Sequence, residues 1–300
     1  MVEPAMIDPF KRTWWMPGWG EIALSSLIWA LVSGMLLVPG FNAHHDPFQS
    51  VSRLISVDAF GYFLHSFHSY SGDIFLIAAF VHTIEYLIKR THRSYLFKQW
   101  FYLILLMIVS ILAVFSGFLS IGSKESASAL HIFDGILQTV PVIGGQLSLF
   151  FIQLTRNINP FSVIYLHHAA TFTILTVILT YVHIKRLKAE RYALLYTGFL
   201  LALLALILPA SLGHPADAVV SVVKGPWYFI GLQEMLSWMP VFVAGIAFPL
   251  IIIGLLAWLP QLKSKDRPVL YAIAVLLIFY LMESVIGWFL RGEGWQIFGR

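Results

Sequence analysis

The chain has 300 residues, of which 59% are hydrophobic and only 11% are charged, and its mean hydropathy is +0.80. A soluble protein of this size needs more polar surface, so the composition indicates a membrane protein. The absence of cysteine excludes disulfides, thiolate metal sites, iron–sulfur clusters and covalent attachment of a c-type haem by this chain. The net charge of +4 does not call for a nucleic-acid partner, because membrane topology accounts for it.

Seven apolar runs are long enough to cross a bilayer, which takes about 20 helical residues. They cover residues 21–39, 65–88, 99–121, 161–184, 191–212, 239–260 and 269–290. We therefore predict an all-α transmembrane fold, a bundle of seven helices. The N-terminus lacks a short apolar core followed by a small-residue cleavage site, so we expect no secretory signal peptide.

The connections between these runs alternate between short, basic segments and long segments. The N-terminus and the short connections carry 13 of the 19 lysines and arginines, which places them in the cytoplasm by the positive-inside rule. We expect a multi-pass protein of a prokaryotic cytoplasmic membrane, with its N-terminus inside and its C-terminus outside. Amphipathic patterns in the long connections, at 123–145 and 218–240, predict short helices on the outer surface.

Four histidines lie within two of the apolar runs. His68 and His82 are 14 residues apart in the second run, and His168 and His183 are 15 residues apart in the fourth. Each separation is about four helical turns, or roughly 21 Å, and returns to within about 40° or 60° of the same helix face. Both runs cross the membrane in the same direction, so the spacing predicts two stacked pairs of histidines, one near each membrane face.

These pairs have several possible roles. A single histidine in a membrane span has a structural role, as a polar link between helices or as part of a water-filled path, about as often as it binds a cofactor. A dinuclear metal site needs carboxylates at the same depth as the histidines. Imidazole pairs without such ligands suit an iron porphyrin held by two axial nitrogens, which transfers electrons. We predict that His68 and His168 hold an outer haem b, and that His82 and His183 hold an inner haem b.

With these histidines the chain resembles the cytochrome b family of bc-type quinol oxidoreductases, in a short, plastid-type form fused to its separate three-helix subunit. Gly20, Gly34 and Gly117 match family glycines that let the porphyrin approach a helix backbone. The segment GPWYF at 225–229 stands in the place of the family's Pro-Glu-Trp-Tyr motif. The resemblance implies a dihaem four-helix domain over residues 1–188 and a three-helix domain over residues 189–300.

The resemblance also implies a function: a dihaem subunit of a respiratory complex that exchanges electrons with a quinone. Because the chain has no cysteine, a second electron acceptor belongs to another subunit docking on the outer loops. A Rieske-type iron–sulfur protein and a c-type cytochrome are the two alternatives, in a complex that we expect to be dimeric. The departures from the family motif favour menaquinol as substrate and a multihaem cytochrome as partner.

The most consequential departure is Pro226, which stands where the family motif has a proton-accepting glutamate. The resemblance assigns Pro226, Trp227 and Tyr228 to the outer quinone site. Glu234 and Asp73 are candidate proton acceptors in place of the missing glutamate. Glu234 has the simpler alternative of a solvated charge, whereas Asp73 lies within a span, where an unpaired carboxylate is costly. His65 and His131 are further substitutes, with a plain loop histidine as the alternative for His131.

Four other positions depart from the family pattern, and one of them is Leu103, which stands 14 residues before Gly117 where the family has a second glycine. His65 and Glu85 stand where the family has arginines near the haem ligands. Glu85 is a candidate for an inner quinone site, with an ordinary interfacial cluster around Lys89 and Arg90 as the alternative. Arg156 lies 12 residues before the predicted ligand His168, farther than the family's usual arginine, which indicates an insertion at 157–163.

Two other functions remain open from the sequence. A dihaem membrane anchor of a periplasmic dehydrogenase or hydrogenase has the same broad activity, but typically needs only four or five spans. A haem-free transporter or scaffold belongs to a different class, in which the histidines relay protons.

Overall fold

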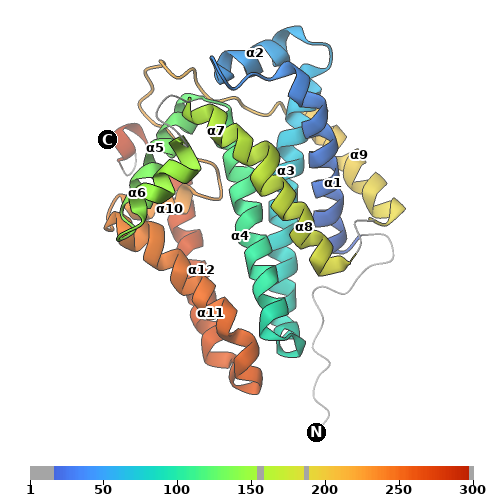
Figure 1. Cartoon of the computed structure of the whole chain (residues 1–300), viewed down its shortest axis with the longest axis vertical. Helices are drawn as coiled ribbons and strands as arrows, with labels where there is room; N and C mark the ends of the chain where they lie inside the picture. The colour runs from blue at the N-terminus through green and yellow to red at the C-terminus, as the bar shows by residue number, and fades with distance from the viewer. Residues whose placement is uncertain (1–16, 154–158, 186–188, 297–300) are drawn as a thin grey trace.

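The structure is a computed structural model that describes residues 17–153, 159–185 and 189–296. Helices that run between two ends of the molecule dominate these residues (Figure 1). Six of the described helices are long and apolar enough to cross a membrane. These spans are Trp19–Gly40, Gly61–Ile88, Phe97–Ser120, Pro160–Ile184, Val243–Lys265 and Arg267–Leu290. The predicted all-α transmembrane class is confirmed.

The fifth predicted span is shorter than expected. We predicted residues 191–212, whereas the helix α9 covers Arg191–Ile207, which are 17 residues and about 25 Å long. The next residue, Leu208, is already extended, with φ −120° and ψ 110°. Leu208 precedes Pro209, and a residue before proline avoids the helical region because of a steric clash with the proline ring.

The first four spans lie together (Figure 1), and the second and the fourth of them carry the four histidines. α1 (Trp19–Leu37) packs along α3 (Gly61–Ile88), and small buried side chains on α1 allow their close approach. The small side chains that are buried on α1 are Ala23, Ser25, Ser26 and Ser33. α4 (Phe97–Ser120) packs against the fourth span, which consists of α7 (Pro160–Leu166), η4 (His167–Phe172) and α8 (Thr173–Ile184).

The long connections lie together at one end of the bundle (Figure 1). They contain the helices α5 (Lys124–Gln138) and α10 (Ile230–Leu236), within the segments where we predicted surface helices, and α6 (Gly144–Ser148), which begins at the end of the first segment and extends beyond it. α2 (Pro47–Val57) was not predicted. Its N-cap, Asp46, accepts a hydrogen bond from the Gln49 N–H at 2.9 Å, and Pro47 occupies the first turn, where a missing N–H costs nothing.

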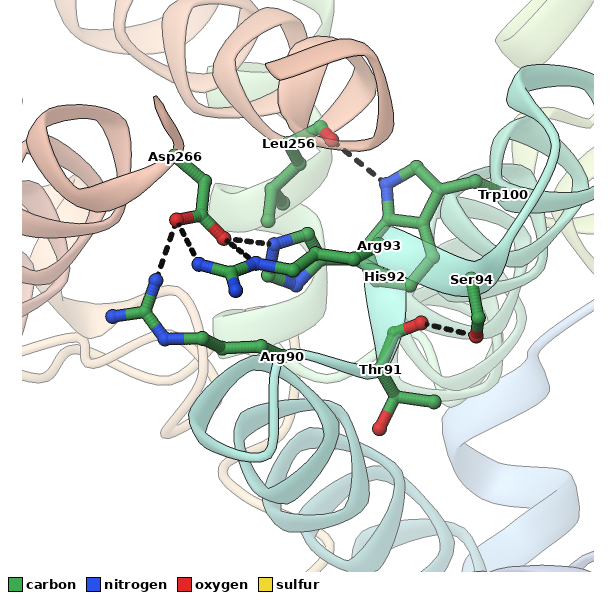
Figure 2. Close-up of polar contacts among 8 residues, drawn as sticks. All are labelled: Arg90, Thr91, His92, Arg93, Ser94, Trp100, Leu256 and Asp266. Atoms are coloured by element: carbon green, nitrogen blue, oxygen red, sulfur yellow. Dashed lines mark hydrogen bonds and ion pairs between the residues drawn. The ribbon is translucent and has the colours of Figure 1, made fainter. Parts of the chain in front are cut away.

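At the opposite end, a buried aspartate fixes the turn between α11 (Phe248–Leu262) and α12 (Arg267–Val285) to the turn after α3 (Figure 2). Asp266 accepts hydrogen bonds from Arg90 Nη1 at 2.5 Å and from His92 Nε2 at 2.8 Å. Arg93 adds two bonds, from Nε at 2.8 Å and from Nη2 at 2.7 Å. The bonds from Arg93 and His92 hold the pKa of Asp266 well below its usual value, although burial opposes them.

A second bond joins α4 to α11 beside this cluster (Figure 2). Pro260 lies inside α11 and has no N–H, so the carbonyl of Leu256 lacks its helical donor. The indole Nε1–H of the buried Trp100 donates to this carbonyl at 2.7 Å. The C-terminal pair of helices is therefore joined to the histidine-bearing part by specific polar contacts at this end.

Candidate functional site

The structure brings the four predicted histidines together in two pairs between α3 and the fourth span. The ring centroids of His68 and His168 are 6.0 Å apart, and those of His82 and His183 are 6.5 Å apart. We call them the first pair and the second pair. The interplanar angles are 80° in the first pair and 61° in the second.

These separations fit one metal ion shared by each pair. An imidazole nitrogen binds a transition metal at about 2 Å, which puts the centroids of two opposed axial rings about 6 Å apart. The described residues contain no group of three or more His, Cys, Asp and Glu side chains able to hold a metal ion by themselves. Each pair thus offers two imidazole ligands, which suits a metal whose other ligands come from a porphyrin.

A π-helical turn helps to align the rings of the fourth span. The π-helical segment η4 begins at His167 and contains His168, and the Thr173 hydroxyl donates a hydrogen bond to the His168 carbonyl. A π-turn takes up one more residue than an α-turn. The π-turn absorbs one of the 15 residues between His168 and His183. The angle between these two histidines around the helix is therefore close to the angle between His68 and His82, which are 14 residues apart on α3.

Backbone carbonyls orient both rings of the first pair. His68 Nδ1 lies 3.0 Å from the Ala30 carbonyl on α1, and His168 Nδ1 lies 2.9 Å from the Ala113 carbonyl on α4. A carbonyl only accepts, so Nδ1 carries the proton in each ring. This tautomer leaves Nε2 free to bind a metal, an arrangement typical of metal-ligating histidines.

Glycines make room for the same two rings. A Cβ added to Gly34 would lie 3.0 Å from His68 Cε1, and a Cβ added to Gly117 would lie 2.7 Å from His168 Cε1. Each glycine follows its carbonyl residue by four positions, so the glycine and the carbonyl share one helix face. The resemblance implied that these glycines face a porphyrin, whereas in the structure they contact the imidazoles; haem contact stays a prediction.

The second pair has a different environment. A Cβ on Gly20 would lie 2.9 Å from His82 Cε1, but on α4 Leu103 occupies the position that would match a second glycine. Glu85 Oε2 lies 4.0 Å from His82 Nδ1, and Glu85 is ion-paired with Lys89 at 2.6 Å. The predicted inner-site residue Glu85 thus lies beside the second pair, with its charge shared with a lysine.

Trp227 and Asp73, two of the residues predicted for the outer quinone site, meet near the middle of α3. Trp227 Nε1 donates a hydrogen bond to Asp73 Oδ1 at 2.9 Å. Next to Trp227, the ring of Tyr228 is buried, and its Oη has no hydrogen-bond partner among the described residues. The carbonyl of Pro226 accepts the Phe229 N–H at 2.8 Å, which closes a turn.

Glu234 has contacts that favour a structural role. Its side chain is buried and is bound by Arg291, through Nε at 2.8 Å and Nη2 at 2.5 Å. Trp295 Nε1 adds a third bond at 3.1 Å. These contacts join α10 to the segment after α12, and proton acceptance by Glu234 stays a prediction that the geometry does not favour.

The remaining histidines and Arg156 have different outcomes. His65 is buried, and its Nδ1 has no partner among the described residues. His131 lies exposed on α5 and lines a groove of about 560 Å³ with Gln233 and Ser237. His167 beside the first pair is buried with both ring nitrogens within hydrogen-bond distance of partners, so it is structural. Arg156 lies outside the described residues.

Sequence reasoning missed the residues that support the sites. The orienting carbonyls belong to alanines, whose side chains give no signal. The Asp266 cluster joins residues more than 170 positions apart, such as Arg93 and Asp266. A usable signal was the single acidic residue in the otherwise basic segment KSKDR at 263–267.

The model of the cytochrome b/b6/petB family matches residues 5–191, a range that includes all four histidines. The chain belongs to the cytochrome b family. It is 25% identical to cytochrome b of Dictyostelium citrinum, over 88% of the chain and 75% of that protein. It is 23% identical to cytochrome b of Solanum tuberosum, over 92% of the chain and 79% of that protein.

A solved structure titled "Hyperthermophilic respiratory Complex III" is similar in fold. Its TM-score is 0.71 at 16% sequence identity, and the match covers 90% of this chain and 82% of that chain. The likeness confirms the cytochrome b fold over most of the molecule. Family membership implies that this cytochrome b binds haem b, for which the two histidine pairs are the candidate ligands.

Proposed function

We propose that this chain is the dihaem subunit of a respiratory complex that oxidises a quinol and passes electrons across the membrane. The observation that carries the proposal is the pairing of four histidines at two levels of the bundle, with separations that fit one iron per pair. Two bound haem b groups would supply the one-electron transfer.

The protein's own contribution is to hold and orient these groups. His68 and His168 would bind the outer haem, and His82 and His183 the inner haem, each through Nε2. The Ala30 carbonyl keeps the proton of His68 on Nδ1, and the Ala113 carbonyl does the same for His168. These two contacts fix the tautomer and the direction of both rings at the first site.

The orientation in the membrane is part of the same proposal. The end that carries η2 (Thr91–Ser94) and η6 (Lys263–Lys265) is basic, so we assign it to the cytoplasm of a prokaryote. The end with α5 and α10 would then face outwards and receive the electron-accepting subunit. That subunit is a Rieske-type iron–sulfur protein or a c-type cytochrome, for which we favour a multihaem form, in a dimeric complex.

The domain division and the substrate complete the proposal. We assign residues 1–188 to the haem-binding domain and residues 189–300 to a C-terminal domain that contributes GPWYF to the quinol site. The proline at the position of the motif glutamate leads us to favour menaquinol over ubiquinol.

Anaerobic mixing of the purified complex with a quinol tests this function. We expect a short-chain menaquinol analogue to reduce b-type haem, as seen by the rise of its α band, faster than a short-chain ubiquinol. A complex whose haem is reduced by dithionite but by neither quinol would contradict the proposed function.

A further inference from the structure

Asp73 is a carboxylate within a membrane-spanning helix. It lies on α3, five residues after the first-pair ligand His68. Its hydrogen bond comes from the neutral indole of Trp227, and among the described residues no lysine or arginine forms an ion pair with it. A carboxylate is costly in a membrane without a compensating charge, so its presence there points to a function.

Tyr228 supplies a second unsatisfied polar group nearby. Its ring is 8% exposed, and its Oη has no partner among the described residues. Burial raises the pKa of Tyr228 well above its usual value, and the Asp73 carboxylate raises it further. The phenol therefore stays protonated and available as a hydrogen-bond donor. The Tyr280 hydroxyl holds the backbone of this residue by donating to the Tyr228 carbonyl at 2.6 Å.

Aromatic and aliphatic side chains surround these two groups. Tyr228 belongs to the same buried hydrophobic cluster as Leu76 of α3, and the neighbouring Phe229 meets Phe115 of α4 edge to face, with centroids 4.6 Å apart. Trp227 is 38% exposed at the edge of this cluster. The region thus combines apolar walls, one hydrogen-bond donor and one anionic acceptor, which suits a flat aromatic ring with hydroxyl groups.

Asp73 is half-buried, whereas two fully buried carboxylates are committed to protein partners. Glu234 is bound by Arg291 through two hydrogen bonds. Glu283 on α12 is buried and accepts a bond from Trp238 Nε1 at 3.1 Å. Asp73 differs, because Trp227 binds its Oδ1 and no side chain or backbone group of the described residues binds its Oδ2.

We propose that Asp73 is the catalytic proton acceptor of the quinol site, and that Tyr228 donates a hydrogen bond to the quinol. This inference rests on the proposed function and deepens it. In the step, one quinol O–H bond breaks, its proton moves to Asp73 Oδ2 and the electron pair stays on the quinol oxygen. The products are a quinolate and a neutral aspartic acid, so no oxidant is needed. Trp227 is a positioning residue that fixes the carboxylate.

The test uses the purified complex with Asp73→Asn and Asp73→Glu, and Asp217→Asn at an exposed position as the matched control. Haem reduction by a short-chain menaquinol analogue is followed by stopped flow, and rates are expressed per dithionite-reducible haem. We expect Asp73→Asn to slow the reduction about 100-fold, the usual contribution of a general base. Asp73→Glu retains a carboxylate and is expected to retain most of the rate, and the control to match wild type.

Each outcome supports or overturns one part of the inference. If Asp73→Asn and a second neutral variant, Asp73→Ser, are as fast as wild type, the assignment of Asp73 is wrong while the proposed function stands. If no quinol reduces the wild-type haem, the proposed function itself fails. Tyr228→Phe is expected to raise the KM for quinol about fivefold, the effect of one lost hydrogen bond; an unchanged KM would remove Tyr228 from the site.

Discussion

At the first histidine pair both Nδ1 atoms lie within 3.0 Å of backbone carbonyls and both rings lie against glycines. At the second pair only His82 lies against a glycine, and within the described part of the chain no carbonyl accepts a hydrogen bond from either ring. Glu85 and its partner Lys89 lie beside His82 instead. The two pairs share ligand type and separation but differ in what orients them.

This difference predicts unequal haems. A carbonyl bonded to Nδ1 fixes the ring and raises its basicity, so the surroundings of a ligand tune the metal that it binds. The first pair is oriented by the backbone of α1 and α4. At the second pair the charge of Glu85 can act on the haem. No carbonyl contact of the first-pair kind holds its rings there in the described residues, but the Asp266 cluster fixes the end of α3 that lies beyond His82. Substitutions at four positions separate these influences.

The largest effect is expected from Asp266→Ala, which leaves the donors around it without an acceptor. Loss of one partner of a buried ion pair costs about 3–5 kcal/mol of unfolding free energy. Because Arg90 follows α3 soon after His82, we expect the second haem to be lost before the first during thermal unfolding followed by haem absorbance. Asp217→Ala at an exposed position is the control. Loss of both haems at the same temperature would show that the Asp266 cluster does not support the second pair in particular.

The same cluster predicts a pH dependence. The pKa of Asp266 is lower in the folded protein than in the unfolded chain. Its contribution to stability is therefore present above the ordinary aspartate pKa of about 4 and is lost as the pH falls through the folded value. Asp266→Asn should reduce the loss of thermal stability upon acidification, and an unchanged acid profile would contradict this account.

Gly117→Ala should weaken the first site next most strongly. The added Cβ would lie 2.7 Å from His168 Cε1 and force the ring to move. We expect affinity for the first haem to fall about 10–100-fold, as when a supporting contact of a metal ligand is lost, with the second haem retained. Gly135→Ala on α5 is the control, since its Cβ meets nothing within 4 Å. Equal haem content in both variants would contradict the role given to Gly117.

Glu85→Gln should affect the second haem only. Removal of a negative charge 4.0 Å from His82 Nδ1 makes the oxidised, more positive haem less favourable. We expect a redox titration to show a higher midpoint potential for one haem and an unchanged value for the other. A shift of both haems, or of neither, would show that Glu85 does not distinguish the pairs.

Ser33→Ala should have the smallest effect. Ser33 Oγ lies 3.1 Å from His68 Nδ1, but it already donates to the Trp29 carbonyl at 2.7 Å, and the Ala30 carbonyl holds the ring. We expect both haems at wild-type content, with thermal stability lowered by about 1 kcal/mol or less. Loss of the first haem in this variant would mean that the hydroxyl, and not the carbonyl, orients His68.

The ligand pairs and the fold class were predictable because they depend on periodicity along single helices. His68 and His82 need only the helical rise and angle to be placed at two depths. The orienting groups were not predictable, since which carbonyl faces His168 depends on the register between α4 and the fourth span. The early end of α9 had a local signal in Pro209, which the count of apolar residues overrode.

The quinol-site residues were predictable only as candidates. Sequence reasoning singled out Asp73 and Glu234 alike, because both are acids near the GPWYF segment or the first ligand. Their difference comes from tertiary contacts: Arg291 neutralises Glu234, whereas in the part of the chain that the structure describes Asp73 has a hydrogen bond from the neutral indole of Trp227 and no ion pair. No local pattern distinguishes the two, as Glu234 and Arg291 are separated by 57 residues.

The most direct test of the paired-ligand account is the haem content of the purified protein, measured by pyridine haemochrome for wild type, His68→Ala and His82→Ala. We predict two b-type haems per chain in wild type, and one in each variant. A dithionite-reduced spectrum and redox titration should then show that each variant has lost a different haem. Wild-type protein without haem b, or variants that both retain two haems, would contradict the account.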